Sequence, residues 1–480
     1  HGVKRRITQL VVATLLLAAC ADARLAGSIV EGTLPTTGIT VSVVDEGGQT
    51  VDAHLTLMDG SNHDSTDGLI QLTLDGPVAG VLTAQGMLDH PVIIDHNRDG
   101  EVTMLSRVGA DGAVRRSLHF AGDTMLARRY LDGAEDAQAL AESVAEGIDD
   151  LFAAADHSTL NLESVVGSLP EELTSPGKRW AIQSIPEIVT MLDRLGVDLV
   201  TLGNNHIGDF DDVGVTTTQG HLEAAGMPWV GAAIEERDAI RPVEYAVEGL
   251  DLLTASFLLP GGDSNNDHLP LSGDDYLIGQ DERLDWQYEF RQADLRGPTS
   301  DLTGAVRAGD AWVWFEENAS DTERDGLLWE QAEAVFPELQ DFGARRAHGG
   351  AALYAEEHVT AALDGSEADL AIVQLHGGFQ YQMAPSRSVV EAARHAVDSG
   401  ADLVVAHHPH VLGGFEYYNG GMIIWSLGNF VFDQELFVTY RSGFARLVYE
   451  DDQLLDASII PVYLLDYRPM PAAGSAALET

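Results

Sequence analysis

The 480-residue sequence contains a single cysteine, Cys20, and only two lysines, Lys4 and Lys178. With no second cysteine the chain cannot form an internal disulfide, and a thiolate metal site and a cysteine nucleophile in the body of the protein are excluded as well. Any metal ion must therefore be held by His, Asp, Glu or Asn side chains.

Positive charge is also scarce. The chain has 27 Lys and Arg residues against 76 Asp and Glu residues, which gives a formal net charge of −49. So acidic a surface repels nucleic acid and anionic lipid, and the sequence argues against nucleic acid as a partner. A solvated acidic surface of this kind suits salty or extracellular water.

The N-terminal residues have the pattern of an export signal. A basic stretch, Lys4–Arg6, precedes an apolar run, Leu10–Ala19, that is too short to span a bilayer as a mature helix. The run ends in "LAAC", which resembles the lipobox of bacterial lipoproteins, whose cysteine is lipidated. We expect a lipoprotein signal peptide at 1–19, a lipid anchor on Cys20, a tether at 20–37, and an exported, membrane-anchored protein in the periplasm or at the cell surface. A plain secretory signal is the alternative.

Short alternating stretches separated by turn residues follow the tether. Their length and spacing predict a small β-sandwich module at 38–110, which resembles the transthyretin-like modules of exported enzymes. Within it, Asp95–Glu101 begins like a calcium-binding loop, but Ser106 stands where the loop needs its last Glu. We therefore predict a hairpin turn there.

From about Arg115 the pattern of apolar residues changes, and apolar strand-like runs alternate with helical patterns. This alternation predicts an α/β domain, in which functional residues lie just past the carboxyl ends of the strands. Residues 260–330 are rich in Asp, Gly and Asn, and we expect them to form an insertion over the site or at its rim.

Polar residues follow five of the apolar runs, and we expect them to meet at one edge of one sheet. They are Asp123, Glu163, Asn205 with His206 and Asp209, His376, and the pair His408 and His410. Neutral imidazole together with carboxylate and amide oxygen suits Zn, Fe or Mn rather than Ca or Mg. Paired ions of this kind, about 3.5–4 Å apart, activate a water molecule and hold the oxygens of a phosphoryl group.

Two separations along the sequence make this prediction more specific. His408 and His410 are two residues apart, so in an extended chain their side chains point the same way, with Pro409 stiffening the backbone between them. His206 and Asp209 are one helical turn apart and fit a general acid with its orienting carboxylate. Two other histidines, His119 and His407, are interpreted as structural.

Taken together, the segments "AGD", "NLE", "GNNHIGD", "HGG", "HHPHV" and "SLGNFVFD" resemble the capsule-synthesis family typified by the CapA protein of poly-γ-glutamate synthesis. The resemblance covers 115–474 and implies a four-layer α/β/β/α sandwich like that of the calcineurin-type metallophosphoesterases. It also implies that His206 is an acid near the leaving group. The metal ligands it implies are Asp123, Glu163, Asn205, His376, His408 and His410.

The sequence departs from the family pattern in three places. Gly377 and Gln380 stand where the fourth motif usually has Trp and Glu, and Ala406 replaces the Gly that usually opens the fifth motif. Met125 occupies the place where metallophosphoesterases usually supply a second ligand from the first motif. Substrate contacts near His376 are therefore expected to differ from the family pattern. One metal position is expected to be poorer in ligands than in the metallophosphoesterases, or to be occupied only with substrate.

These observations favour an exported, lipid-anchored hydrolase that uses two divalent metal ions (Mn, Fe or Zn). It would act on a phosphoester or a related bond in the metabolism of capsule or other cell-surface polymers. The alternative is a non-hydrolytic accessory protein that handles or retains an anionic polymer of the poly-γ-glutamate type with membrane partners of capsule synthesis. A third interpretation is a surface adhesion protein whose β-module carries the function.

Overall fold

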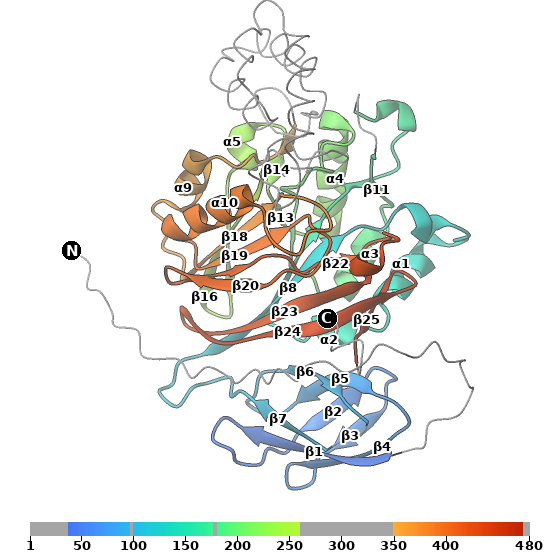
Figure 1. The fold of residues 1–480 in the computed structure, drawn as a ribbon, viewed down its shortest axis with the longest axis vertical. Coiled ribbons are helices and arrows are strands. Elements are labelled where there is room, and N and C mark those ends of the chain that lie inside the picture. Colours follow the sequence, from blue (N-terminus) through green and yellow to red (C-terminus); the bar gives the residue numbers. More distant parts are fainter. Residues whose placement is uncertain (1–36, 97–98, 176–179, 260–348, 474–480) are drawn as a thin grey trace, which may run out of the picture. The chain divides into compact units, whose positions relative to one another are not determined.

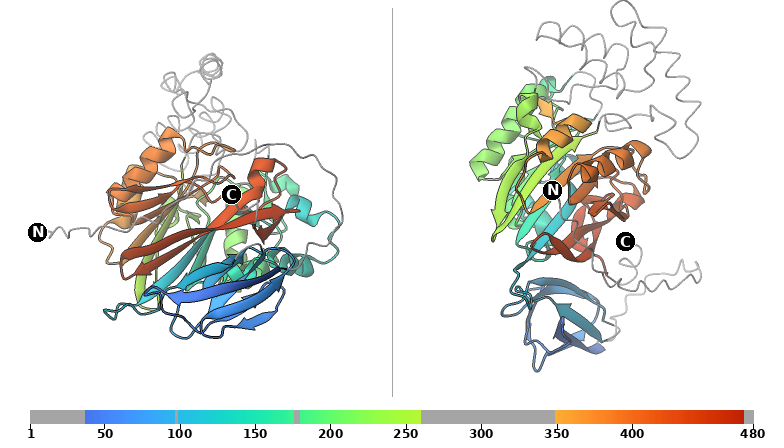
Figure 2. Two further views of the ribbon diagram at one scale, coloured as in Figure 1. Left: turned by 60° about the horizontal axis from the view of Figure 1, so that its bottom comes forward. Right: turned by 90° about the vertical axis from the view of Figure 1, so that its left-hand side faces the viewer.

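The computed structural model describes residues 37–96, 99–175, 180–259 and 349–473 (Figures 1 and 2). The predicted signal peptide, all but the last residue of the predicted tether, and the predicted insertion at 260–330 lie outside the described residues. Among the described residues, no helix combines the length and the apolarity that crossing a bilayer requires.

The first described segment forms two small sheets around a shared core. Alternation along β4 (Leu69–Leu74) buries Ile70, Leu72 and Leu74 and leaves the residues between them exposed, as expected for a strand with one face on a core. One sheet has the order β4-β1-β7, and the other has the order β3-β2-β5-β6. The other strands are β1 (Thr37–Asp45), β2 (His54–Leu57), β3 (Asn62–Asp64), β5 (Val78–Thr83), β6 (His90–Ile94) and β7 (Gly100–Met104).

The hairpin predicted at Asp95–Glu101 is wrong. The strand before it, β6, pairs with β5, whereas the strand after it, β7, pairs in parallel with β1 of the other sheet. The segment therefore carries the chain from one sheet to the other. Turn residues reveal that a chain changes direction, but they do not reveal which strand it joins next.

The larger region contains a mixed eight-stranded sheet of order β13-β12-β9-β8-β23-β24-β25, with β22 also paired to β8. Strands β8, β9, β12 and β13 are parallel, so their carboxyl ends share one edge. The strands are β8 (Arg115–Thr124), β9 (His157–Leu162), β12 (Leu199–Thr201), β13 (Trp229–Val230), β22 (Asn429–Val431), β23 (Arg441–Glu450), β24 (Gln453–Leu465) and β25 (Arg468–Pro471).

A second, six-stranded sheet has the order β15-β16-β18-β19-β21-β20. Its central strands are parallel and almost entirely buried, which explains why they read as continuous apolar runs in the sequence. The strands are β15 (Val243–Val247), β16 (Leu250–Leu258), β18 (Leu370–His376), β19 (Leu403–His407), β20 (Phe415–Tyr418) and β21 (Gly421–Ile424).

Three apolar clusters hold these elements together. One joins β8 and β23 of the first sheet to β16, β18 and β19 of the second, so the two sheets face each other. A second cluster packs α1 (Ala137–Ala145) and α3 (Ile188–Arg194) against the first sheet, and a third packs α9 (Glu356–Leu363) and α10 (Arg387–Asp398) against the second. The α/β prediction is confirmed. The expectation that the five motif-bearing strands share one sheet is wrong, because β8, β9 and β12 lie in the first sheet and β18 and β19 in the second.

Shorter elements complete the described chain. The remaining α-helices are α2 (Asp149–Phe152), α4 (Asp211–Ala225) and α5 (Glu236–Ala239), and the 3₁₀ helices are η1 (Arg128–Leu131), η2 (Glu171–Leu173) and η6 (Phe437–Tyr440). Two-stranded pairs are formed by β10 (Val165–Val166) with β11 (Gln183–Ser184) and by β14 (Ala232–Ala233) with β17 (Gly350–Ala351).

A buried histidine at the start of β9 makes the stability of this fold depend on pH. Burial lowers the pKa of His157 from 6.5 to about 4, and its Nε2 lies 2.9 Å from the Tyr245 hydroxyl and 3.0 Å from Thr159 Oγ1. Between these two pKa values the unfolded chain binds the extra proton and the folded chain does not. Acidification from pH 6.5 towards 4 therefore lowers the free energy of unfolding through this group.

We expect wild type to lose roughly 1 kcal/mol per pH unit relative to a His157→Gln variant over this range. Urea unfolding of both proteins at pH 7, 6 and 5 measures the difference. Parallel stability curves for the two proteins would contradict the prediction.

Candidate metal centre

The six residues predicted as metal ligands meet at one place between the two sheets. Asp123 is the last residue but one of β8, His376 ends β18, and the other four follow β9, β12 or β19. All six side chains are buried, with at most 2% of the surface of any residue exposed. The set is Asp123, Glu163, Asn205, His376, His408 and His410. The structure thus brings together the residues that the sequence singled out.

Strand pairing places Asp123 at the centre of the first sheet's edge. It lies opposite Asn161 of β9 on one side and Asn429 of β22 on the other. The close approach of β22 depends on Gly122, because a Cβ at this position would overlap the carbonyl oxygen of Gly428. That carbonyl accepts a hydrogen bond of 3.0 Å from the Asp123 backbone N–H. The glycine of "AGD" therefore allows the aspartate to reach the site.

Histidines and an amide surround the Asp123 carboxylate. Its Oδ2 lies 3.1 Å from His410 Nδ1 and accepts a 3.2 Å hydrogen bond from the His408 backbone N–H. Its Oδ1 accepts a 2.8 Å bond from Asn161 Nδ2. Burial alone would raise the pKa of Asp123, but the hydrogen bond with His410 and the nearby histidines lower it well below its ordinary value. Asp123 is therefore a carboxylate anion, the form that binds metal.

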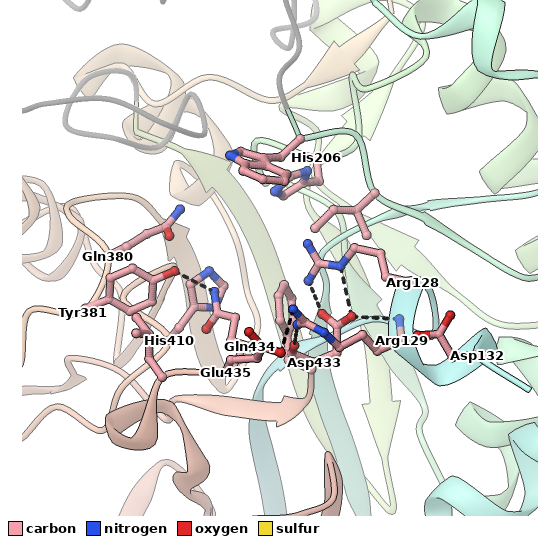
Figure 3. Close-up of a pocket in the computed structure, with 14 residues that line it drawn as sticks. Arg128, Arg129, Asp132, His206, Gln380, Tyr381, His410, Asp433, Gln434 and Glu435 are labelled. Carbon is pink, nitrogen blue, oxygen red and sulfur yellow. Dashed lines mark hydrogen bonds and ion pairs between the residues drawn. The ribbon is translucent and has the colours of Figure 1, made fainter.

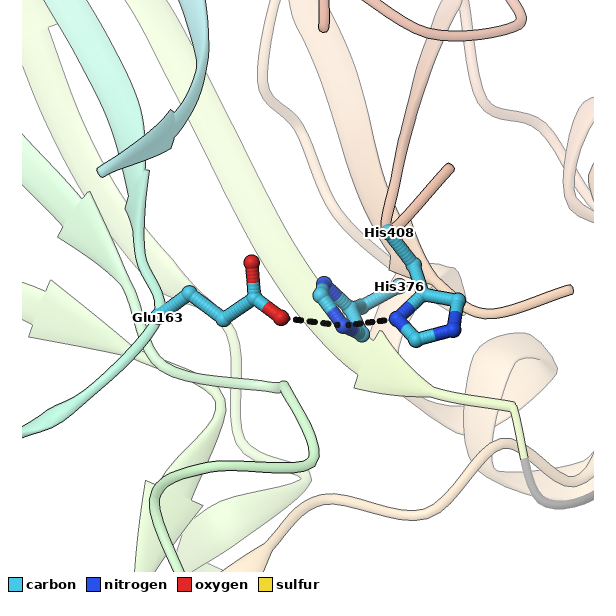
Figure 4. Close-up of side chains that lie close together, drawn as sticks. All are labelled: Glu163, His376 and His408. Carbon is cyan, nitrogen blue, oxygen red and sulfur yellow. Dashed lines mark hydrogen bonds and ion pairs between the residues drawn. The ribbon is translucent and has the colours of Figure 1, made fainter. Parts of the chain in front are cut away.

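The carboxylate of Glu163 faces His376 and His408 (Figure 4). The backbone N–H of Glu163 donates to the Thr124 carbonyl at 2.9 Å, which fixes it beside the end of β8. Its Oε1 is 3.4 Å from His376 Nε2 and 3.9 Å from Nε2 of both His206 and His410. One carboxylate thus faces histidines from both sheets.

His376 ends β18 and links the two halves of the site. Its Nε2 lies 2.8 Å from Asn205 Oδ1 and 3.1 Å from His408 Nδ1, and its Nδ1 lies 3.2 Å from Asn161 Nδ2. Burial, followed by the proximity of His408, lowers the pKa of His376 well below 6.5. The imidazole is therefore neutral, as a metal ligand must be.

His408 and His410 converge for a reason other than the predicted one. Strand β19 ends at His407, and both histidines adopt positive φ angles, 96° and 57°, rather than extended backbone. Such angles are rare for residues with a side chain and tend to occur at functional sites. The two rings lie with centroids 5.8 Å apart, one against His376 and the other against Asp123. Alternation along a strand does not explain this arrangement.

His206 and Asp209 form the predicted pair. His206 Nδ1 lies 2.7 Å from Asp209 Oδ2, which also accepts a 2.6 Å bond from the Ile182 backbone N–H. The carboxylate therefore orients the ring and holds the proton on Nδ1, which leaves Nε2 on the side of Glu163. This geometry suits a residue that exchanges a proton at Nε2.

Four residues around the ligands are not among the predicted ligands, and the sequence leaves one of them, Asn429, open between a contact with the site and backbone packing. Asn204 donates to Asn161 Oδ1 and the Leu162 carbonyl and accepts from the backbone N–H groups of His206 and Ile207, so it shapes the turn that presents Asn205. Asn161 bridges Asp123 and His376, and its only sequence signal is an amide in a buried strand. Asn429 Oδ1 lies 2.8 Å from His410 Nδ1, which places it in the site.

The fourth of these residues is His407, interpreted from the sequence as structural. It lies behind the site, with Nε2 2.8 Å from Gln374 Oε1 and Nδ1 3.7 Å from Asp123 Oδ1. Burial lowers its pKa to about 4. His119 is fully buried and has Nδ1 2.8 Å from the Phe152 carbonyl, so it belongs to the core as predicted.

The donor set fits divalent metal ions. Glu163, His376 and His408 offer ligand atoms that all lie within 4.8 Å of one another, and so do Asp123, Glu163 and His410. Glu163 belongs to both groups. These buried groups can hold a metal ion. Met125 is buried in the apolar core and contributes no ligand, in keeping with its departure from the metallophosphoesterase pattern.

A pocket of about 690 Å³ opens onto this centre (Figure 3). Its wall includes His410, one of the six candidate ligands, and His206. Gln380, which stands where the family pattern has Glu, also lines it. The other lining residues are Arg128, Arg129, Asp132, Trp180, Ile182, Tyr381, Phe432, Asp433, Gln434, Glu435 and Leu436.

Residues 117–434, more than half of the chain, match the model of the family described as bacterial capsule synthesis protein PGA_cap. The chain belongs to this family. The match includes every residue of the candidate metal centre and confirms the resemblance recognised from the motifs. Membership of the PGA_cap family links the protein to capsule synthesis without defining its chemistry.

Individual proteins show the same relationship. The chain is 24% identical over 356 residues to the PGA biosynthesis protein CapA of Bacillus subtilis, covering 74% of this chain and 73% of that protein. It is 38% identical over 108 residues to the capsule biosynthesis protein CapA of Bacillus anthracis, covering 22% and 26% respectively. A hypothetical protein from Thermus thermophilus of known crystal structure aligns with a TM-score of 0.36 at 14% identity, covering 72% of this chain and 98% of that one.

Proposed function

We propose that this member of the PGA_cap family is a metal-dependent hydrolase that cleaves a phosphoester or a related bond in the metabolism of capsule or cell-surface polymer. The observation that carries the proposal is the position of Glu163. It is a buried carboxylate common to two groups of ligand atoms, and His410 of the second group lines a pocket large enough for a substrate.

The metal ions and the side chains would have different roles in the proposed reaction. Bound divalent ions, which we propose to be two ions of Mn, Fe or Zn, would polarise the scissile group and lower the pKa of a water molecule. Asp123, Glu163, Asn205 and the three histidines would hold them. His206, oriented by Asp209, would give a proton to the leaving group from Nε2. The buried setting limits access of bulk water to these groups.

Three further predictions belong with this proposal. We propose that the two facing sheets and their outer helices form the four-layer sandwich of the calcineurin-type metallophosphoesterases. We propose that residues 38–110 are a separate transthyretin-like module. The "LAAC" segment supports export and a lipid on Cys20, which would hold the catalytic domain near membrane-bound partners of capsule synthesis.

The accessory role is the second candidate. It is favoured by Met125, because loss of a ligand position from the first motif would weaken one of the two proposed metal positions. It is also consistent with the name of the Bacillus subtilis relative, which refers to biosynthesis. Under this alternative the centre would retain an anionic polymer without cleaving it.

A direct experiment separates the two roles. We expect the chain reconstituted with Mn²⁺, Fe²⁺ or Zn²⁺ to hydrolyse bis(p-nitrophenyl) phosphate, to lose this activity with a chelator, and to recover it when metal is restored. His408→Ala should lack both metal and activity, whereas His395→Ala, a half-buried histidine on α10, should behave like wild type. A metal-loaded protein that cleaves nothing in a panel of phosphoesters but binds poly-γ-glutamate would favour the accessory role.

A further inference from the structure

The pocket beside the metal centre contains an arginine that is held in place by a buried carboxylate. Arg128 contacts Asp433 through Nη2 and through Nε, the latter at 3.2 Å, and its guanidinium lies 5.4 Å from the centre of the Phe432 ring. Asp433 is fully buried, whereas about a third of the Arg128 side chain is exposed. The carboxylate of the pair is thus enclosed by the protein, whereas the guanidinium is partly exposed at the pocket wall.

The backbone around this pair is also constrained. Asp433 Oδ2 accepts a 3.0 Å bond from the Arg129 backbone N–H, and the Asp433 carbonyl accepts a 2.6 Å bond from Arg129 Nη1. Arg128 adopts a φ of 52°, in the left-handed region that residues with a side chain rarely occupy. Residues held in such a conformation by several contacts are typical of ligand-binding positions.

One nitrogen of the Arg128 guanidinium, Nη1, does not contact Asp433. Arg128 Nε and Nη2 are turned to Asp433, and Nη1 has no hydrogen-bond partner among the described residues. In Figure 3 this nitrogen points away from Asp433, toward the side of the pocket where His206 lies. Because a guanidinium is planar, fixing one edge on a carboxylate fixes the direction of the other.

The neighbouring arginine is arranged differently. Arg129 Nη1 donates to the Asp433 carbonyl and Nη2 lies 3.0 Å from Glu435, so both terminal nitrogens of its guanidinium already have partners in the protein. The other charged groups of the pocket wall are the acidic residues Asp132 and Glu435, which disfavour an anion. Arg128 is therefore the position at which a negatively charged group of a ligand is best received.

We propose that Arg128 is a specificity-determining residue, which binds a second anionic group of a substrate whose scissile group lies at the metal centre. Asp433 is the positioning residue that aims it. The substrate class is thus one with two anionic groups, carboxylate or phosphoryl, in the same bound segment. This inference rests on the proposed function, because it takes the cluster around Glu163 as the place of the reaction.

The test compares probes with one and two anionic groups. We would titrate the Mn²⁺-reconstituted chain with inorganic phosphate, with methylenediphosphonate and with γ-linked triglutamate by calorimetry. Arg128→Gln should weaken binding of at least one two-group probe about tenfold more than binding of inorganic phosphate, as expected for loss of a charge-assisted hydrogen bond. If Arg128→Gln selectively weakens binding of methylenediphosphonate, the second anionic group is phosphoryl. If it selectively weakens binding of triglutamate, the second group is a carboxylate.

Variants of two other residues complete the test. Asp433→Asn should shift the affinities in the same direction, and Arg128→Lys should retain only part of the preference because an ammonium lacks the planar fork. Arg394→Gln is the matched control. Arg394 also binds one carboxylate, Glu416, through Nε and Nη2 and lies 5.0 Å from the centre of the Tyr418 ring, but it is not part of the pocket wall. Circular dichroism and metal content establish that each variant is folded.

Three results would overturn the inference. The first is an equal change for all three probes in Arg128→Gln, and the second is the same selective change in Arg394→Gln. The third is wild-type protein that binds neither two-group probe more tightly than inorganic phosphate. Failure of the proposed function looks different, since it appears as absence of metal uptake or of phosphoester hydrolysis in wild type on the same samples.

Discussion

Glu163→Gln is expected to abolish high-affinity metal binding and to lower phosphodiester hydrolysis at least about 100-fold, because even an outer-sphere partner of a metal ligand is worth about 10- to 100-fold. Glutamine has nearly the same shape as glutamate, but it is neutral and cannot bridge two cations. Glu163→Gln should therefore lower metal binding more than replacement of a ligand that belongs to only one of the two groups. Elemental analysis of reconstituted protein and initial rates with bis(p-nitrophenyl) phosphate measure both losses.

Thermal unfolding gives an independent measure of the same loss. A ligand that binds only the folded protein stabilises it, by about 2.7 kcal/mol at 100 times its Kd. Added Mn²⁺ should therefore raise the Tm of wild type and leave that of Glu163→Gln unchanged. Glu450→Gln is the control, because Glu450 is a mostly buried partner of Arg115 outside the centre. Retention of full metal content by Glu163→Gln would refute the assigned role.

His206→Ala is expected to lower kcat by about 10²- to 10⁴-fold for a phosphodiester with an alkyl leaving group, the usual size of general acid catalysis. An alkoxide needs a proton as it departs, whereas p-nitrophenolate does not. The loss should therefore be much smaller with a p-nitrophenyl substrate. Metal content should stay at the wild-type value, because His206 belongs to neither group of candidate ligands.

Asp209→Asn tests the orientation of His206 separately. Removing the carboxylate charge leaves a neutral group beside Nδ1, so we expect a loss in the same direction and of smaller size. Equal losses for alkyl and p-nitrophenyl leaving groups in His206→Ala would contradict a role in protonation. Loss of metal from His206→Ala would instead make it a ligand.

Strand ends were the part of the site that the sequence could predict. Apolar runs such as those before Asp123, His376 and His408 mark buried parallel strands, and polar residues after such runs gather at the carboxyl edge of a sheet. This local rule holds whether the strands lie in one sheet or two. The candidate ligands could therefore be identified from the sequence. The placement of β8 and β18 in different sheets could not, because apolar runs carry no information about strand pairing.

Contacts that depend on the folded backbone could not be predicted in this way. The positive φ angles of His408 and His410 break the alternation on which their convergence was argued. The amide of Asn161 has meaning only because β8 and β9 pair in register with Asp123 opposite it. The contact of Arg128 with Asp433 joins residues 305 positions apart, and neither has a local pattern that points to the other.

The central claim is that the two facing sheets surround a metal centre with Glu163 at its middle. Anomalous diffraction from crystals of the Zn²⁺- or Mn²⁺-reconstituted protein, collected at the absorption edge of the metal, tests it most directly. We predict one anomalous peak among Glu163, His376 and His408 and another among Asp123, Glu163 and His410. Anomalous density confined to surface carboxylates, with none at these buried groups, would contradict the account.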